Sequence, residues 1–168
     1  DFLDIYLIAN SRFVIFPHSG LKHLAIVLRV PVVCVNVICY IGIYYLQNID
    51  ICVPKKLWSK ESNRYLTFRE IFDSDIATFT TSMLYEDNGI EVIENTSEEI
   101  LDAATEMEMR LSGTWLSEDN DEELQNRFKQ LALKCVLPDG TLIRDILPDG
   151  IKCKVSSQFL RNNKDLLN

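Results

Sequence analysis

The residues best suited to chemistry lie in one short turn near the start of the chain. A β-rich run over residues 12–16 leads into His18, Ser19 and Gly20, and a helix is expected to begin at once, at Leu21. The first N–H groups of a helix have no partner within the helix, so they can bind an anion. Glycine lets a phosphate come close, and a histidine can add a hydrogen bond or a positive charge. The alternative is that Ser19 only caps the helix and Gly20 only permits the turn.

Polar residues further along the chain are additional candidates for binding. Asn36 ends the next apolar run, where its side chain can face a cleft or simply form a turn. Lys55 and Lys56 follow Pro54 in a loop, where they can neutralise a phosphate or point into solvent. No metal site is expected, because neither histidine has a cysteine pair near it. No residue stands out as a catalytic base.

The elements around the turn are expected to place it at one edge of a sheet. Residues 31–35, Pro-Val-Val-Cys-Val, indicate a strand that is apolar on both faces, which is typical of a parallel sheet. We therefore predict that residues 12–16 and 32–35 are adjacent parallel strands, joined by a right-handed crossover through a helix over 20–29. This is an α/β fold with the turn at the carboxyl ends of the strands, where such sheets bind ligands.

The second half of the chain is expected to be mainly helical. Thr67 with Glu70 and Thr96 with Glu99 have the spacing of capping boxes, and residues 90–93 alternate like a brief strand. Helices are predicted over 97–111 and 119–135, as an antiparallel pair whose carboxylates face water. Their buried faces are expected to consist of Ile100, Leu101, Ala104, Met107 and Leu111 in the first helix, and Leu124, Phe128, Leu131 and Cys135 in the second.

We expect two parts of unequal size. Residues 1–136 are predicted to form an α/β domain, and residues 137–168 a tail with turns and a short helix. The tail repeats Leu-Pro-Asp-Gly at 137–140 and 147–150. Pro-Asp-Gly is typical of turns, so the repeat either bounds a small hairpin or forms two separate loop turns.

Charge and cysteine content exclude several classes of protein. The chain has a formal net charge of −8, and residues 86–123 hold 14 acidic residues against Arg110 alone, so a general nucleic-acid binder is not expected. Its 5 cysteines form no C-x-x-C pair, which indicates buried thiols in a reducing compartment. Residues 30–46 lack charge, but they are short for a membrane span and are better interpreted as a buried strand.

The turn and its flanking strands resemble the donor-binding half of GT-B glycosyltransferases and the related UDP-N-acetylglucosamine 2-epimerases. More broadly, the chain resembles the C-terminal part of a family of glycosyltransferases from bacterial surface-carbohydrate clusters. One position departs from the epimerase pattern, because Ala25 stands where a helix glutamate holds the ribose. The segments that carry the resemblance lie at 11–21, 30–36, 50–56, 66–70, 89–100 and 159–161.

The resemblance implies a Rossmann-like half of a GT-B fold with C-terminal helices, in which residues 1–136 form the Rossmann-like domain that binds a nucleotide-sugar. It implies an enzyme that transfers a sugar from a nucleotide-activated donor to a surface glycan or similar acceptor, with no cofactor, in the cytoplasm or at the inner face of the cell membrane. An N-terminal domain is expected to precede this segment and to supply the base, so the segment alone is expected to be inactive. The alternatives are an epimerase-like enzyme and a non-catalytic α/β interaction domain that docks through its acidic helices. The implied donor-binding residues are His18, Ser19, Gly20, Leu21, Asn36 and Lys55.

Overall fold

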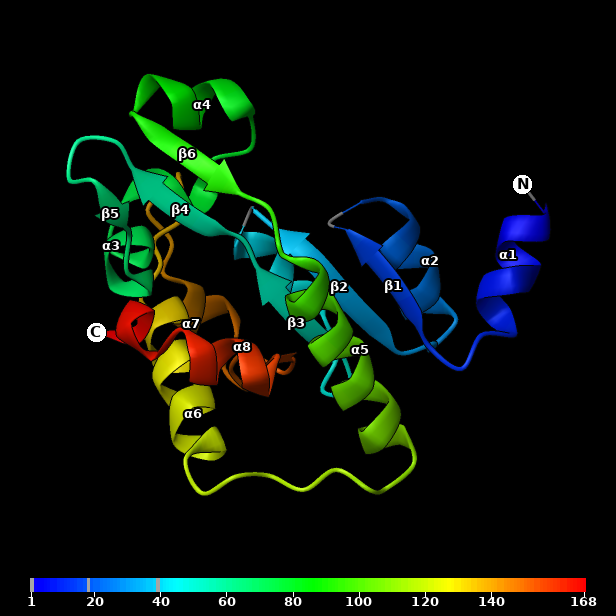
Figure 1. Cartoon of the computed structure of the whole chain (residues 1–168). Helices are drawn as coiled ribbons and strands as arrows, with labels where there is room; N and C mark the ends of the chain where they lie inside the picture. Colours follow the sequence, from blue (N-terminus) through cyan, green and yellow to red (C-terminus); the bar gives the residue numbers. More distant parts are fainter. Residues whose placement is uncertain (1, 18, 39) are drawn as a thin grey trace.

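A parallel sheet of four strands forms the centre of the molecule. The computed structural model describes residues 2–17, 19–38 and 40–168. The strands are β1 (Val14–Pro17), β2 (Val32–Val37), β3 (Ile51–Pro54) and β7 (Lys154–Val155), in the spatial order β1-β2-β3-β7 (Figure 1). All three pairings are parallel. The prediction of an α/β fold is confirmed.

The predicted β–α–β unit is present. Helix α2 (Leu21–Val27) joins β1 to β2, which pair in parallel with Val14 opposite Val32 and Pro17 opposite Val35. β2 is almost wholly buried, as expected of a strand that is apolar on both faces. In Figure 1, α2 lies behind β1, whereas the long helix α5 (Ser97–Leu111) crosses in front of β2 and β3. Each face of the sheet is thus covered by a helix.

A small antiparallel sheet carries the chain from β3 to α5. Its strands are β4 (Lys56–Ser59), β5 (Arg64–Tyr65) and β6 (Ile90–Ile93), in the order β5-β4-β6. Between β5 and β6 lie three short helices, α3 (Phe68–Phe72), η2 (Asp75–Thr78) and α4 (Ser82–Asp87). Both predicted capping boxes are confirmed, at the starts of α3 and α5. Because β6 runs back along β4, α5 begins near the carboxyl end of β3.

The expected packing of the acidic helices is wrong in two respects. Leu101 is 65% exposed, and the buried positions of α5 are Glu99, Ala103, Glu106 and Met107. Nor do α5 and α6 (Asp121–Ala132) form a simple antiparallel pair, because α8 (Ser157–Asn162) packs against both.

Specific partners explain why these carboxylates are not all in water. Glu106 accepts hydrogen bonds from the backbone N–H and the hydroxyl of Ser157, at 2.7 and 3.0 Å. It also forms an ion pair with Arg110. The predicted apolar face of the second helix is confirmed, since Leu124, Phe128, Leu131 and Cys135 are all buried.

Residues 137–168 are part of the same core. They supply α7 (Ile143–Ile146), strand β7, helix α8 and η3 (Lys164–Leu167), and Phe159 and Leu160 are buried. The first Leu-Pro-Asp-Gly closes a minimal hairpin, because Val136 and Leu142 form an antiparallel bridge. Both copies use glycine at positive φ, +85° at Gly140 and +74° at Gly150.

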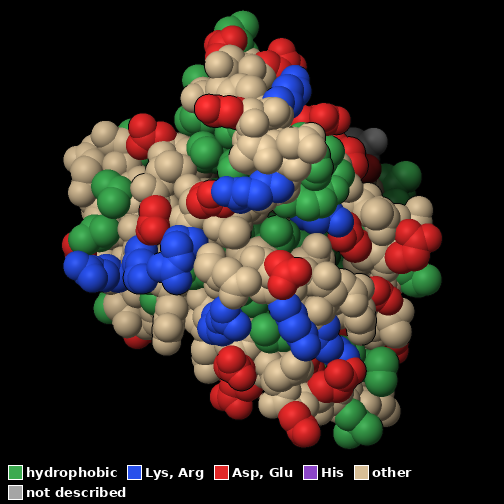
Figure 2. All heavy atoms as spheres, turned by 60° about the vertical axis from the view of Figure 1, so that its left-hand side comes forward, with side chains coloured by type: hydrophobic (Ala, Val, Ile, Leu, Met, Phe, Trp, Pro, Cys, Tyr) green, Lys and Arg blue, Asp and Glu red, His purple; other side chains and the backbone are tan. Residues whose placement is uncertain are grey.

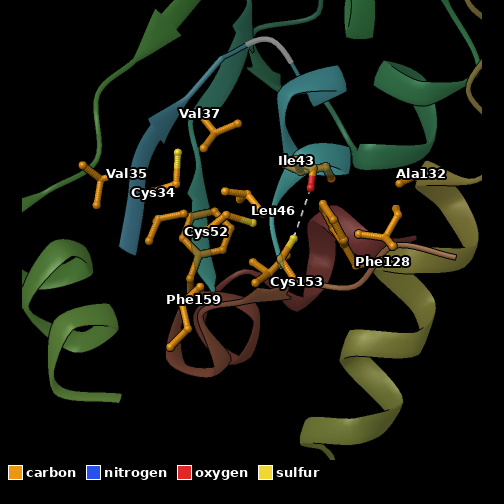
Figure 3. Packing of buried hydrophobic residues seen from close by; sticks show 14 of the residues in the cluster. Cys34, Val35, Val37, Ile43, Leu46, Cys52, Phe128, Ala132, Cys153 and Phe159 are labelled. Carbon is orange, nitrogen blue, oxygen red and sulfur yellow. Dashed lines mark hydrogen bonds between the residues drawn. The ribbon is translucent and has the colours of Figure 1, made fainter. Parts of the chain in front are cut away.

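The stretch over residues 30–46 is not a membrane span. It forms β2 and the 3-10 helix η1 (Tyr40–Tyr45), and the described residues contain no helix long and apolar enough to cross a membrane. Figure 3 shows Cys34, Cys52 and Cys153 among the buried side chains around the sheet. These three and Cys135 are free thiols, as expected. Cys39 lies outside the described residues.

Candidate functional site

The sheet register brings the predicted site residues to one edge. The last residue of β1, Pro17, is level with Val35, and Val37 near the end of β2 is level with Pro54 at the end of β3. Ser19, Gly20 and Leu21 follow β1, Asn36 lies near the end of β2, and Lys55 follows β3. All of them therefore lie at the carboxyl edge of the sheet, where open α/β sheets bind their ligands. His18 lies outside the described residues.

The turn before α2 has an open helix start and an ordinary backbone. Gly20 is the N-cap of α2, with φ −60° and ψ −33°, and no side chain caps the helix. The alternative in which Ser19 caps α2 is not supported, because the N-cap is Gly20, and the backbone angles of Gly20 do not require glycine. A Cβ built on Gly20 meets no atom within 4 Å. The glycine leaves space in front of the helix that the fold itself does not require.

Asn36 has a structural role at this edge. Its φ is +53°, and it exchanges two hydrogen bonds with Asn95 just before α5. The N–H of Asn36 donates to Asn95 Oδ1 at 2.6 Å, and the N–H of Asn95 donates to Asn36 Oδ1 at 2.8 Å. Asn95 Nδ2 also donates to the carbonyl of Pro54 at 2.9 Å. These three hydrogen bonds join β2, β3 and the start of α5, and so they position the carboxyl edge of the sheet.

The two lysines that follow Pro54 are both ion-paired. Lys55 Nζ lies 2.6 Å from Glu94 Oε1, and Lys56 Nζ lies 2.7 Å from Glu99 Oε1. The pairs differ in burial: Glu94 is 67% exposed at its side chain, whereas Glu99 is 11% exposed. An anionic ligand can take the place of an exposed carboxylate far more easily than that of a buried one. Lys55 is therefore the better candidate for a ligand contact.

A buried cation near the turn was missed from the sequence. Lys22, in the first turn of α2, is only 1% exposed. The Cα–Cβ bond of a helical residue tilts toward the helix N-terminus, which for α2 is the end that follows β1. Burial raises the pKa of the neighbouring Cys34 thiol to about 11, and the positive charge of Lys22 opposes that rise. The signal was present in the sequence, since Lys22 shares a helix face with the buried Ala25 three residues on.

A cavity that the sequence did not predict lies near the opposite edge of the sheet. It measures about 440 Å³ and includes Ile49, Arg110, Trp115 and Lys154 in its lining. The Arg110 guanidinium lies 4.8 Å from the Trp115 ring centre and is ion-paired with Glu106. Its charge therefore already has partners in the fold, which makes this cavity the weaker candidate for an anion.

Comparisons with models of protein families, with curated proteins and with solved structures found no match to this chain. The resemblance to GT-B glycosyltransferases therefore stays a prediction. Fold and edge geometry are the grounds on which a function can be proposed.

Proposed function

We propose that the chain binds the diphosphate of a nucleotide-activated sugar at the carboxyl edge of its parallel sheet, as the donor-binding part of a glycosyltransferase. The observation that carries the proposal is a buried cation, Lys22, placed one residue inside a helix whose open start follows β1. A helix start and an adjacent lysine both favour negative charge. The open space at Gly20 gives a phosphate room to approach.

Such an edge would act by stabilising the leaving group. In sugar transfer, the bond between the sugar carbon and the diphosphate oxygen breaks, and the acceptor hydroxyl forms the new bond to that carbon. Negative charge then develops on the diphosphate, where fixed N–H groups and cations are most effective. In this proposal Ser19, Gly20 and Lys22 hold the diphosphate, and Lys55 reaches it once Glu94 moves away. No residue of this chain is assigned as the base.

The two alternatives have less support. An epimerase-like site would need a carboxylate at residue 25 to hold the ribose, but that position is a fully buried alanine of α2. An interaction domain that docks through acidic helices would need an unbalanced acidic surface. Basic residues from several parts of the chain instead neutralise part of the acidic stretch: Glu94 pairs with Lys55, Glu99 with Lys56, Glu106 with Arg110, Glu108 with Arg12 and Glu118 with Arg161.

Figure 2 supports the same view of the charge distribution. On the face drawn there, acidic and basic side chains are interspersed, and no continuous acidic field covers it. Mixed charge of this kind keeps a surface hydrated without selecting a basic partner.

Titration calorimetry with uridine diphosphate tests the proposal. We expect binding by the diphosphate and none by uridine. Gly20→Val should abolish it while the protein stays folded, because the space around Gly20 is open and its backbone angles are ordinary. Lys22→Met should weaken binding about tenfold or more, the value of a hydrogen bond to a charged group.

The matched control is Lys60→Met, at an exposed lysine in the turn after β4, which should bind like the parent. Melting curves report whether each variant is folded. If the folded parent shows no diphosphate binding at millimolar concentrations, or if folded Gly20→Val binds as tightly as the parent, the proposal is wrong.

A further inference from the structure

Helix α1 (Phe2–Ala9) is apolar on almost every side and is largely uncovered. Asp4 is its only charged residue, and among its residues only Ile8 is buried. Phe2 is 80% exposed, and Leu3, Ile5, Tyr6 and Leu7 are also exposed. In Figure 1, α1 stands at one end of the molecule, beside α2. Helices that are apolar all round normally lie inside a structure, so this one is expected to be covered.

The apolar surface continues from α1 onto the edge of the sheet. A cavity of about 310 Å³ lies between α1, β1 and the start of α2, and its lining includes Leu7, Ile15 and Leu21. β1 is the outermost strand of the parallel sheet on this side. We call this surface the α1–β1 face; it consists of Phe2, Leu3, Tyr6, Leu7, Ile15 and Leu21.

We propose that two copies of this chain associate through the α1–β1 face, with exposed apolar side chains on α1 of each copy packed into the cavity between α1 and β1 of the other. A two-fold interface needs a surface that is complementary to itself. This face presents a projecting apolar helix beside a mainly apolar hollow, whose polar lining residues are Asp4 and Ser11.

The exposed area fits a specific dimer. The six residues of the face expose about 600 Å² per copy, counting a large apolar residue at roughly 150–250 Å². A standard protein interface buries about 800 Å² per partner, including its polar rim. The face is also larger than the single apolar residues that are normal on a monomer surface.

Charge favours a second copy over a lipid surface. The chain has a net charge of −8, and α1 contains no lysine or arginine to attract anionic headgroups. Two acidic chains repel least when they meet through the region with the least charge. Residues 2–11 contain one acidic residue, whereas residues 86–123 contain 14. Association through the α1–β1 face keeps the acidic helices in solvent.

Sedimentation velocity across micromolar concentrations tests the proposal on the intact 168-residue chain. We expect a species of twice the 19.4 kDa chain mass that dissociates on dilution. Leu3→Glu and Tyr6→Glu should each raise the dissociation constant about 30-fold or more, as for an interface residue of high energy. Both residues are exposed in the single chain, so both variants should melt like the parent.

The matched controls are Leu101→Glu and Leu116→Glu, which place the same charge at leucines that are 65% and 83% exposed elsewhere. They should leave the dimer unchanged. A chain that stays monomeric at all concentrations overturns the proposal, as does a dimer that the α1 variants and the controls affect equally. Co-sedimentation of the parent, but not of Tyr6→Glu, with phosphatidylcholine–phosphatidylglycerol vesicles in place of dimer formation would assign the face to lipid instead.

Discussion

The two edges of the parallel sheet use buried charge in different ways. At the amino edge, Asp50 is 2% exposed, and its carboxylate accepts hydrogen bonds from the N–H groups of Val32 and Gln47 at 2.9 and 2.7 Å. At the carboxyl edge, Lys22 is equally buried, but the neighbouring cation Lys55 pairs with an exposed carboxylate. The Asp50 carboxylate thus holds the backbone in place, whereas Lys55 can exchange its carboxylate partner for an anionic ligand. Ligand binding is therefore expected at the carboxyl edge.

Substitutions at the amino edge should lower the free energy of unfolding more than substitutions at the carboxyl edge. Asp50→Ala leaves two N–H groups without their acceptor, which should lower the free energy of unfolding by about 2–4 kcal/mol. Diphosphate affinity of the folded fraction should stay at the parent value. Urea denaturation measures the first effect and calorimetry the second. Asp87→Ala, at an exposed acid on α4, should change stability by less than about 0.5 kcal/mol.

Substitution of Asn36 should cause the next largest loss of stability. Asn36 lies at the carboxyl edge, but its role there is structural. Asn36→Ala removes the acceptor of the Asn95 N–H, and alanine tolerates φ +53° less well than asparagine, so it should cost about 2–4 kcal/mol. Asn36→Gly loses the same bond without the backbone strain and should cost about 1–2 kcal/mol less. Thermal melts of the two variants measure the difference. Equal losses would show that the positive φ adds no strain.

Lys55 and Glu94 should affect binding in opposite directions. Lys55→Met removes a cation and should weaken diphosphate binding about tenfold. Glu94→Gln frees Lys55 from its 2.6 Å ion pair and should strengthen binding by up to about fivefold, the energy of an exposed pair. Calorimetry on both variants at one ionic strength checks the signs. Weaker binding by Glu94→Gln would mean that Lys55 does not reach the ligand.

Two carboxylates predict opposite and small pH effects. Burial raises the pKa of Asp50, so the stability associated with its neutral form is lost as pH rises through that raised value. The hydrogen bond from Arg64 lowers the pKa of Glu70 to about 2, so the stability from that pair is present above the ordinary pKa and lost as pH falls toward 2. The Arg64–Glu70 pair is exposed, so its contribution to stability should be small.

Arg64→Gln isolates the second effect. It should return the Glu70 pKa toward the ordinary value, which carboxyl NMR titration measures directly. An unchanged Glu70 pKa in this variant would show that the pair does not persist in solution.

Local patterns explain what the sequence predicted correctly. The strand–turn–helix–strand unit follows from apolar runs and a proline within about twenty residues, and both capping boxes depend on residues three apart. These features are decided by neighbours in the chain, so periodicity and spacing are sufficient to find them.

Contacts between distant residues explain what was missed. The hydrogen bonds between Asn36 and Asn95 join residues 59 positions apart in the sequence, and those between Glu106 and Ser157 join residues 51 positions apart. No spacing rule connects such residues before the fold is known. The same is true of strand β7: the N–H groups of Lys154 and of Ser156, just after the strand, donate to the distant carbonyls of Asp50 and Cys52. Leu101 was assigned to the buried face because a helical stripe alone cannot show which side meets α8.

Amide chemical shifts provide the most direct test of binding at the carboxyl edge. In a ¹H–¹⁵N titration with uridine diphosphate, we expect the amides of Ser19, Gly20 and Leu21 to shift and saturate together. The amides of Val32 and Gln47, which are bonded to Asp50 at the amino edge, should stay in place. Saturable shifts at Val32 and Gln47 with none at Ser19–Leu21 would contradict the account and move the binding site to the other edge of the sheet.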